Sequence, residues 1–343
     1  MNILITGGLG FIGSNFTRYY LTTHPSDELV NLDKLTYSAN PENLRDLSAD
    51  PRYHFIQGDI LDESILMKIC RDYSPRAVLH FAAESHVDRS IKGSKAFIQT
   101  NILGTHTLLE IFKQYWQGAL TEDSSFRFLY VSTDEVYGSL GPEGFFTEDT
   151  PFHPNSPYSA SKAGADLLVQ AYFETYALPT LIVRPSNNYG PYQFPEKFIP
   201  LMITNLLEDR PVPLYGQGVN VRDWLFVEDA CRAIDQVIQK GRIGEAYNIG
   251  GESERPNIEV ARDVLSALLK GEEYLRFVTD RPGHDLRYAL SNRKIKQEIG
   301  WQPGVEFPEG LSRTITWYQE NTWWWKSLKK RLEQESKGFW SKT

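Results

Sequence analysis

A glycine-rich turn between the first predicted strand and the first predicted helix constrains this fold more than any other feature. The apolar run Asn2–Thr6 is followed by Gly7, Gly10 and Gly13 in the spacing GxxGxxG. Glycines here let the main chain approach a phosphate, and the start of a helix offers it unpaired N–H groups. Asp33 ends the second predicted strand 20 residues later, where a carboxylate can bind ribose hydroxyls. The pattern predicts a Rossmann-type dinucleotide site.

Strand-like segments alternate with longer helical patterns through the first half of the chain, which is typical of a parallel sheet. The strand candidates are 2–6, 29–33, 53–57, 77–82, 127–132 and 180–184. Runs such as Ala77–Ala83 are apolar almost throughout, as expected of strands that helices cover on both faces. We therefore predict an α/β fold with a doubly wound parallel sheet.

Beyond Tyr189 the pattern changes. Prolines become frequent around a helical segment at 196–209 and a strand-like run at 212–215. We predict a cofactor-binding domain over 1–189 and a second, smaller α/β substrate domain over 190–343. The region of about 223–250 again has a strand–helix–strand pattern and is expected to return to the first domain. We expect Trp323–Trp325 to pack near the C-terminus and the polar tail 326–343 to be solvated.

Composition and charge exclude several classes of protein. Hydrophobic residues make up 41% and charged residues 23%, which argues against disordered and coiled-coil chains. A net charge of −8 argues against nucleic acid as a partner. The two cysteines and seven histidines show neither CxxC nor HExxH spacing, so we predict no metal site. No basic leader and no 18-residue apolar stretch occurs, so we expect a cytoplasmic protein that has no membrane partner.

Tyr158 and Lys162 lie four residues apart at the start of a predicted helix, so their side chains share one face. A lysine ammonium lowers the pKa of a nearby tyrosine towards that of a useful general base, and it can also bind a nicotinamide ribose. A tyrosine and a basic residue at this spacing occur about twice by chance in such a chain. Here, however, the pair follows the fifth strand of a dinucleotide-binding pattern.

That fifth strand ends in the segment STDEVYG at 132–138, which contains Asp134 and Glu135. Adjacent acids on a regular strand point to opposite faces, but at the C-terminal end of a strand both can enter a cleft. Two carboxyls in a partly desolvated site tend to separate their pKa values, so that one acts as an acid and the other as a base. Elimination of water next to a ketone needs this division.

Longer motifs carry a resemblance over nearly the whole chain. They are TGGLGFIGS (6–14), FAAESHVDRS (81–90), STDEVYG (132–138), PYSASK (157–162), RPSNNYGPYQFPEKFIP (184–200) and DRPGHDLRYA (280–289). With them the chain resembles the dTDP-glucose 4,6-dehydratases, a family of the extended short-chain dehydrogenase/reductase superfamily. The pair Asp134 and Glu135 is the discriminating feature, since 4-epimerases of the superfamily carry small or neutral residues there.

The resemblance implies a hydro-lyase that converts dTDP-glucose to dTDP-4-keto-6-deoxyglucose through an internal redox cycle with tightly bound NAD. Tyr158 takes the proton of the glucose 4-hydroxyl while hydride leaves C4, and Thr133 hydrogen-bonds the same oxygen. Glu135 then removes the C5 proton and Asp134 protonates the departing 6-hydroxyl. Hydride finally returns to C6 while Asp134 helps to reprotonate C5. Lys162 completes the implied catalytic set.

The resemblance also implies binding residues. For the cofactor they are Gly7, Gly10, Phe11, Ile12, Gly13, Asp33, Lys34, Leu35, Thr36, Asp59, Ile60, Phe81, Ala82, Ala83, Ser85, Thr100, Tyr158, Lys162 and Asn188. For the nucleotide sugar they are Ser85, Thr133, Asn187, Lys197, Phe198, Pro213, Leu214, Tyr215, Arg222, Asn257, Arg281 and His284.

The charges of several of these residues favour particular ligands. Asp33 would repel a 2′-phosphate, which favours NAD over NADP. Asp59 could reach the adenine, or it could equally well cap the following helix. A diphosphate needs local positive charge in an acidic protein, and we expect Lys197, Arg222, Arg281 and His284 to supply it.

Other functions stay open. A UDP-sugar 4-epimerase, or a 4,6-dehydratase of a UDP-, CDP- or GDP-hexose, needs the same oxidation at C4; the acid pair weighs against an epimerase. A non-catalytic dinucleotide sensor is a third alternative, against which the full catalytic set weighs. The resemblance further implies a homodimer formed through helices of the cofactor domain. The apolar helix at 102–112 is a candidate for this contact, although packing in the core explains it equally well.

Overall fold

The computed structural model describes residues 1–120 and 125–336, and a seven-stranded sheet lies at its centre. Its strands are β1 (Asn2–Thr6), β2 (Glu28–Asp33), β3 (Tyr53–Gln57), β4 (Ala77–His80), β5 (Arg127–Val131), β6 (Thr180–Pro185) and β10 (Ala246–Ile249). Their order is β10-β6-β5-β4-β1-β2-β3, and every neighbouring pair is parallel. All six predicted strands are present within two residues of their expected bounds, which confirms the parallel sheet.

Side chains of each strand alternate between two hydrophobic cores, one on each face of the sheet. Leu4, Val30, Val78, Phe128 and Ile182 belong to one core, and Ile3, Ile5, Leu79, Leu129 and Leu181 belong to the other. Because both faces are buried, the strand sequences lack the polar alternation of a half-exposed sheet.

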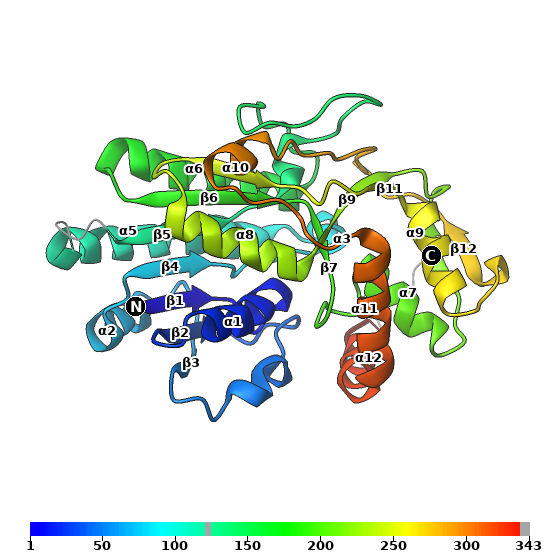
Figure 1. Cartoon of the computed structure of the whole chain (residues 1–343), viewed down its shortest axis with the longest axis horizontal. Helices are drawn as coiled ribbons and strands as arrows, with labels where there is room; N and C mark the ends of the chain where they lie inside the picture. Colours follow the sequence, from blue (N-terminus) through cyan, green and yellow to red (C-terminus); the bar gives the residue numbers. More distant parts are fainter. Residues whose placement is uncertain (121–124, 337–343) are drawn as a thin grey trace.

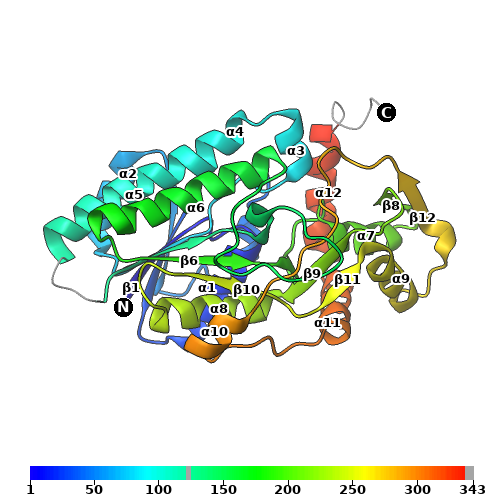
Figure 2. The same cartoon turned by 90° about the horizontal axis from the view of Figure 1, so that it is seen from above.

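Helices cover both faces, so the large unit has three layers (Figure 2). One face carries α1 (Phe11–Thr23), α8 (Val227–Lys240) and α10 (Arg293–Glu298). The other carries α2 (Glu63–Tyr73), α5 (Thr105–Tyr115) and α6 (Pro157–Tyr176). The helix α5 continues the short helix α4 (Lys95–Phe97) through the π-helical turn η2 (Ile98–Gly104), and a second π-helical turn, η3 (Trp116–Leu120), follows it. The doubly wound fold predicted from the sequence is confirmed.

A smaller unit with its own core lies beyond the C-terminal ends of the central strands (Figure 1). It contains a three-stranded sheet of β7 (Asn187–Tyr189), β9 (Val221–Phe226) and β11 (Glu254–Pro256), and a pair formed by β8 (Val212–Tyr215) and β12 (Leu275–Val278). Its helices are α7 (Phe198–Leu206), α9 (Asn257–Ala267), α11 (Phe307–Glu320) and α12 (Thr322–Ser336).

The return to the large sheet starts later than the expected region 223–250. The strand β9 pairs with β7 and β11, whereas α8 and β10 join the large unit. The division into domains at 189 stays a prediction.

The C-terminal segment differs in part from its prediction. Trp324 and Trp325 are buried near the C-terminus as expected, but Leu328 and Lys329 of the supposedly solvated tail are buried too. The reason is an apolar stripe at helical spacing within a mainly polar sequence. Residues 337–343 of the predicted tail lie outside the described residues. In the described part of the chain, no helix has the length and apolar character needed to cross a membrane.

Candidate active site

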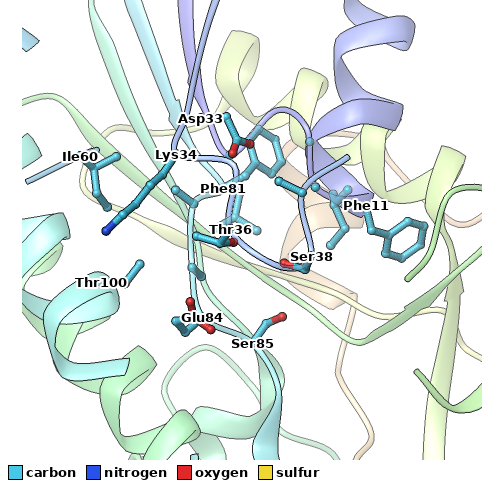
Figure 3. A pocket seen from close by; sticks show the side chains of 18 of the residues that line it. Phe11, Asp33, Lys34, Thr36, Ser38, Ile60, Phe81, Glu84, Ser85 and Thr100 are labelled. Atoms are coloured by element: carbon cyan, nitrogen blue, oxygen red, sulfur yellow. The ribbon is translucent and has the colours of Figure 1, made fainter. Parts of the chain in front are cut away.

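A cavity follows the C-terminal edge of the large sheet, and Figure 3 shows the side chains around it. All but two of the predicted cofactor residues line it. The exceptions are Leu35, whose side chain packs against a small apolar cluster, and Asn188, whose Nδ2 donates to the Ser186 oxygen at 2.9 Å. Ligands of open α/β sheets bind at this edge.

The cavity also has lining residues that sequence reasoning missed. They are Leu32, Ser38, Ala39, Gly58, Glu84, Val131, Ser132, Gln193 and Phe194. Direct neighbours of predicted residues are Leu32, Gly58, Glu84 and Ser132, whereas Gln193 and Phe194 come from the second half of the chain. They lie within the motif at 184–200, which was the available signal.

The glycine loop fits a pyrophosphate because side chains are sterically excluded from it. Gly7 has φ +75°, and a Cβ atom there would lie 2.6 Å from the nitrogen of Ala82. A Cβ atom on Gly13 would lie 2.4 Å from the oxygen of Gly7. The helix α1 begins after Gly10, where no side chain caps it, so the N–H groups of its first turn are available to an anion.

Asp33 ends β2 in a buried position at this loop. Its two carboxylate oxygens accept hydrogen bonds from the N–H of Leu9 at 3.0 Å and of Leu35 at 2.9 Å. Burial raises the pKa of Asp33, while the two hydrogen bonds act in the opposite direction. A carboxylate has further lone pairs for two ribose hydroxyls, so the loop and Asp33 together suit a dinucleotide.

Asp59 lines the cavity and does not cap the next helix. It pairs with Lys34 at 2.5 Å, and its Oδ1 accepts from the N–H of Leu61 at 3.1 Å. The N-cap of α2 is Asp62 instead, which accepts from the N–H groups of Ser64 and Ile65. Of the two roles considered for Asp59, helix capping is therefore wrong.

The helix α6 presents Tyr158 and Lys162 to the cavity. A capping box between Ser156 and Ser159 fixes where α6 starts. The Nζ atom of Lys162 donates to the main-chain oxygen of Val131 at 2.7 Å. Burial lowers the pKa of Lys162 to about 7, and Asp166 one turn further along opposes the shift.

The expected lowering of the Tyr158 pKa by Lys162 is wrong for the protein alone. Burial raises the pKa of Tyr158, the charge of Glu135 adds to the rise, and a hydrogen bond with Thr133 opposes it. Desolvation of the Tyr158 hydroxyl thus outweighs any lowering of its pKa by Lys162, whose ammonium is bonded to the main-chain oxygen of Val131. The hydrogen bond places the hydroxyls of Tyr158 and Thr133 side by side.

Asp134 and Glu135 occupy a short 3-10 turn, η4 (Asp134–Tyr137), directly after β5. Thr133 is the N-cap of this turn: its Oγ1 accepts from the N–H of Glu135 at 3.3 Å and donates to Asp134 at 3.1 Å. The turn removes the opposite-face geometry of a strand, so both acids can serve one site. Asp134 is only 2% exposed, and its Oδ2 has no hydrogen-bond partner.

Different surroundings separate the two carboxyls electrostatically. Burial raises the pKa of Asp134 well above its usual range, and the nearby charge of Glu135 adds to this. Burial also raises the pKa of Glu135, but Arg281, Arg222 and Lys197 oppose the shift. The rise of the pKa is thus pronounced at Asp134, whereas the three basic residues counteract it at Glu135, and a separation of this kind is what acid–base chemistry needs.

The predicted basic residues differ in how their charges are balanced. Arg222 donates to the Asp285 main-chain oxygen at 2.9 Å, and Lys197 to the Ser85 oxygen at 2.8 Å. These hydrogen-bond acceptors are neutral carbonyls and not carboxylates, so both side chains could also bind an anionic ligand. Arg281 pairs with Asp88 at 3.1 Å, but its Nε is buried without a partner.

His284 is a correction to the sequence analysis, which expected it to supply positive charge. Its Nδ1 lies 2.6 Å from Asp280. Burial, and next the charge of Arg281, lower the pKa of His284. The imidazole is consequently neutral at pH 7 and can contribute only a hydrogen bond.

The remaining predicted substrate residues fall into three groups. Asn187 and Asn257 each have a buried Oδ1 without a hydrogen-bond partner. Phe198 stacks on Trp224, with ring centroids 6.1 Å apart. The hydroxyl of Tyr215 donates to Oδ2 of Asp88 at 2.9 Å. Pro213 is exposed and Leu214 is buried in the protein, and the binding roles predicted for both stay predictions.

Comparisons with known proteins agree with this arrangement. The family model described as GDP-mannose 4,6 dehydratase matches residues 4–314. The dTDP-glucose 4,6-dehydratase of Neisseria meningitidis is 50% identical over 339 residues, which cover 95% of each chain. That of Haemophilus influenzae is 51% identical over 336 residues, covering 94% of this chain and 99% of the relative.

Solved structures of the same enzyme are also similar. The dTDP-glucose 4,6-dehydratase of Bacillus anthracis, in complex with NAD, is 48% identical with a TM-score of 0.88 and covers 96% and 99% of the two chains. The Streptomyces venezuelae enzyme, also with NAD bound, is 49% identical with a TM-score of 0.91 and covers 96% and 100%. The chain therefore belongs to the dTDP-glucose 4,6-dehydratase family.

Proposed function

We propose that the protein is a hydro-lyase that converts dTDP-glucose to dTDP-4-keto-6-deoxyglucose with bound NAD. The observation that carries this proposal is the pair Asp134 and Glu135, whose pKa values are shifted to different extents and whose charges act on Tyr158, a residue that lines the cavity. An epimerase of the same superfamily has no use for an acid and a base at C5 and C6.

The glycine loop, the start of α1 and Asp33 would bind the NAD pyrophosphate and ribose. Bound NAD supplies one chemistry, which is to accept hydride from C4 and to return it at C6. The negative charge of Asp33 disfavours the 2′-phosphate of NADP. Lys162 has further N–H donors besides the one bonded to Val131, and these would bind the nicotinamide ribose.

Tyr158 and Thr133 would act together on the 4-hydroxyl of the sugar. Their hydrogen-bonded hydroxyls can both reach one substrate oxygen. Tyr158 accepts the proton of that hydroxyl, and Thr133 donates a hydrogen bond that fixes the oxygen. The resulting ketone at C4 makes the proton at C5 acidic.

Glu135 and Asp134 would then divide the elimination between them. Glu135, where Arg281, Arg222 and Lys197 oppose the rise of the pKa that burial causes, would accept the C5 proton. Asp134, kept neutral by burial, donates a proton to the 6-hydroxyl as the C6–O bond breaks and water leaves. As hydride is returned at C6, the pair would reprotonate C5, and the net reaction is dehydration without net oxidation.

The test is incubation of the purified protein with dTDP-glucose in D₂O without added cofactor, followed by NMR. A 4-keto-6-deoxy sugar with deuterium at C5 supports both the bound NAD and the elimination. A galactose epimer would favour the epimerase alternative, and unchanged sugar even after addition of NAD would overturn the proposal. Parallel reactions with UDP-, CDP- and GDP-glucose test the choice of nucleotide.

We also propose that the protein forms a homodimer through η2 and α6. The predicted candidate, the helix at 102–112, mostly faces the core, since Leu108, Leu109 and Phe112 are fully buried. Large apolar side chains are exposed at Leu103, within that segment, and also at Ile98 of η2 and Leu167 of α6. An apolar surface of this kind is typical of a protein interface. The cytoplasmic location expected from the sequence stays a prediction.

A further inference from the structure

The indole N–H of Trp324 connects the C-terminal helix α12 to the glycine loop. Its Nε1 donates to Oδ1 of Asn43 at 2.8 Å, and Nδ2 of Asn43 donates to the main-chain oxygen of Leu9 at 2.9 Å. Leu9 lies inside the GxxGxxG turn, and its own N–H donates to Asp33. A continuous chain of bonds therefore runs from α12 to the carboxylate proposed to bind the ribose.

These bonds are shielded from solvent. Trp324 and Asn43 are each 1% exposed. Removing one partner would leave a buried polar group unpaired, which costs more than the loss of an exposed hydrogen bond.

The ring of Trp324 contacts the opposite wall of the cavity. It packs edge-on against Tyr192, with centroids 5.9 Å apart. Gln193 and Phe194, directly after Tyr192, line the cavity. The backbone of Tyr192 has φ 64°, a conformation that residues other than glycine rarely adopt. Packing of the Tyr192 side chain must therefore stabilise it. Trp317 of α11 contributes to this packing at 4.6 Å.

The helix α12 is itself anchored in the smaller unit. Lys329 donates to Asn205 at 2.9 Å and to Glu208 at 2.7 Å. The indole of Trp325 donates to the main-chain oxygen of Tyr318 at 2.8 Å. Trp324 is consequently held in place by the smaller unit while it contacts Asn43, which bonds to the glycine loop, and Tyr192, which precedes the cavity residues Gln193 and Phe194.

We propose that Trp324 is a positioning residue that joins the two walls of the cofactor cavity, through Asn43 on one side and Tyr192 on the other, and so slows the release of NAD. The inference rests on the proposed function, because it requires that NAD binds in this cavity. A dinucleotide enclosed between the glycine loop and segment 192–194 leaves more readily when the walls separate. Separation breaks the Trp324 contacts.

The test compares the rates at which variants release the cofactor. Trp324→Phe removes the N–H group but keeps an aromatic ring against Tyr192. Protein loaded with NADH is mixed with excess NAD, and the loss of NADH fluorescence gives the dissociation rate constant. We expect Trp324→Phe to release NADH about threefold to tenfold faster, as the loss of one buried hydrogen bond predicts. Trp323→Phe is the matched control, since Trp323 is 53% exposed, and it should release NADH at the wild-type rate.

A double variant tests whether Trp324 acts through Asn43. Asn43→Ala breaks the same chain from its other end, so adding Trp324→Phe to it should give little further acceleration. Asn43→Ala alone also tests the proposal if Trp324→Phe does not fold. Release at the wild-type rate from the single variants, or additive effects in the double variant, would overturn the role of Trp324. Absence of NADH binding by the wild-type protein would instead overturn the proposed function.

Discussion

The Nζ atom of Lys162 lies 2.7 Å from the main-chain oxygen of Val131, in a buried position on the wall of the cavity. The ammonium is thus bonded to a carbonyl dipole and not to a carboxylate. Burial lowers the pKa of Lys162 to about 7, with Asp166 opposing the shift. The residue therefore changes its charge close to neutral pH in the protein alone.

Lys162→Met should consequently alter how stability depends on pH. An unfolded lysine has a pKa of about 10.4, so between pH 7 and that value the unfolded chain binds more protons at this site than the folded one. The free energy of unfolding of the wild type should therefore rise with pH, relative to Lys162→Met, across this window. Urea unfolding from about pH 6 to about pH 10 measures it. A difference in the free energy of unfolding between the two proteins that does not change with pH would contradict the lowered pKa of Lys162.

Asp134→Asn and Glu135→Gln should each separate the oxidation from the elimination. Asn cannot donate the proton that leaves with water, and Gln cannot accept the C5 proton, so we expect the 6-deoxy product to form about a hundredfold to ten-thousandfold more slowly. Oxidation at C4 should persist, seen as NADH absorbance that accumulates in a single turnover. The exposed control Asp149→Asn should behave as the wild type. Normal turnover in either acid variant would refute the roles assigned to the pair.

The rate of the wild-type reaction should fall on both sides of an optimum pH. Asp134 acts as an acid, so activity is lost as the pH rises through its raised pKa. Glu135 acts as a base, so activity is lost as the pH falls through its pKa, which burial also raises. In Glu135→Gln the residual rate should lose the acidic limb only. Retention of that limb would assign it to another group.

Tyr158→Phe should slow the first oxidation itself. Without the phenol oxygen, only Thr133 remains next to the 4-hydroxyl, and it is no base. We expect NADH formation in a single turnover to slow by about a hundredfold or more, in contrast to the acid variants. Rapid accumulation of NADH in Tyr158→Phe would exclude it as the base.

Local sequence patterns were sufficient for the strands and for the cofactor loop. The run 2–6 and the glycines after it determine their structure through local sterics and burial, so their positions could be predicted. The direction of a charged side chain depends on groups distant in sequence. Lys162 bonds to Val131, 31 residues earlier, and the rise of the Tyr158 pKa, which burial causes, could not be inferred from a spacing of four.

Two other differences from the sequence analysis also depend on geometry that the sequence does not show. Asp59 and Asp62 both precede α2, and only the geometry distinguishes which of them caps it. The Trp324 to Asn43 hydrogen bond spans 281 residues. Nothing in the mainly polar sequence of the C-terminal segment indicates that it packs on the glycine loop.

Gly13→Ala should weaken NAD binding and also lower the stability of the folded protein. The added Cβ atom would lie 2.4 Å from the Gly7 oxygen, so the start of α1 must move away from the loop. Overpacking of this kind costs about 1–3 kcal/mol. We expect a purified variant with little bound NAD and a lower midpoint of thermal unfolding. Gly93→Ala, where nothing lies within 4 Å of the added atom, is the control. Equal NAD content in both variants would contradict the close approach at Gly13.

Leu103→Glu should dissociate the proposed dimer while leaving the monomer folded. Leu103 is 50% exposed on η2, so a charge is tolerated there in the isolated chain but would be desolvated at an apolar interface. Sedimentation velocity should show a dimer for the wild type and mainly monomer for Leu103→Glu. Leu269→Glu is the matched control, because Leu269 is 93% exposed and lies after α9 in the smaller unit. A monomeric wild type would refute the dimer, and a dimeric Leu103→Glu would move its interface away from η2.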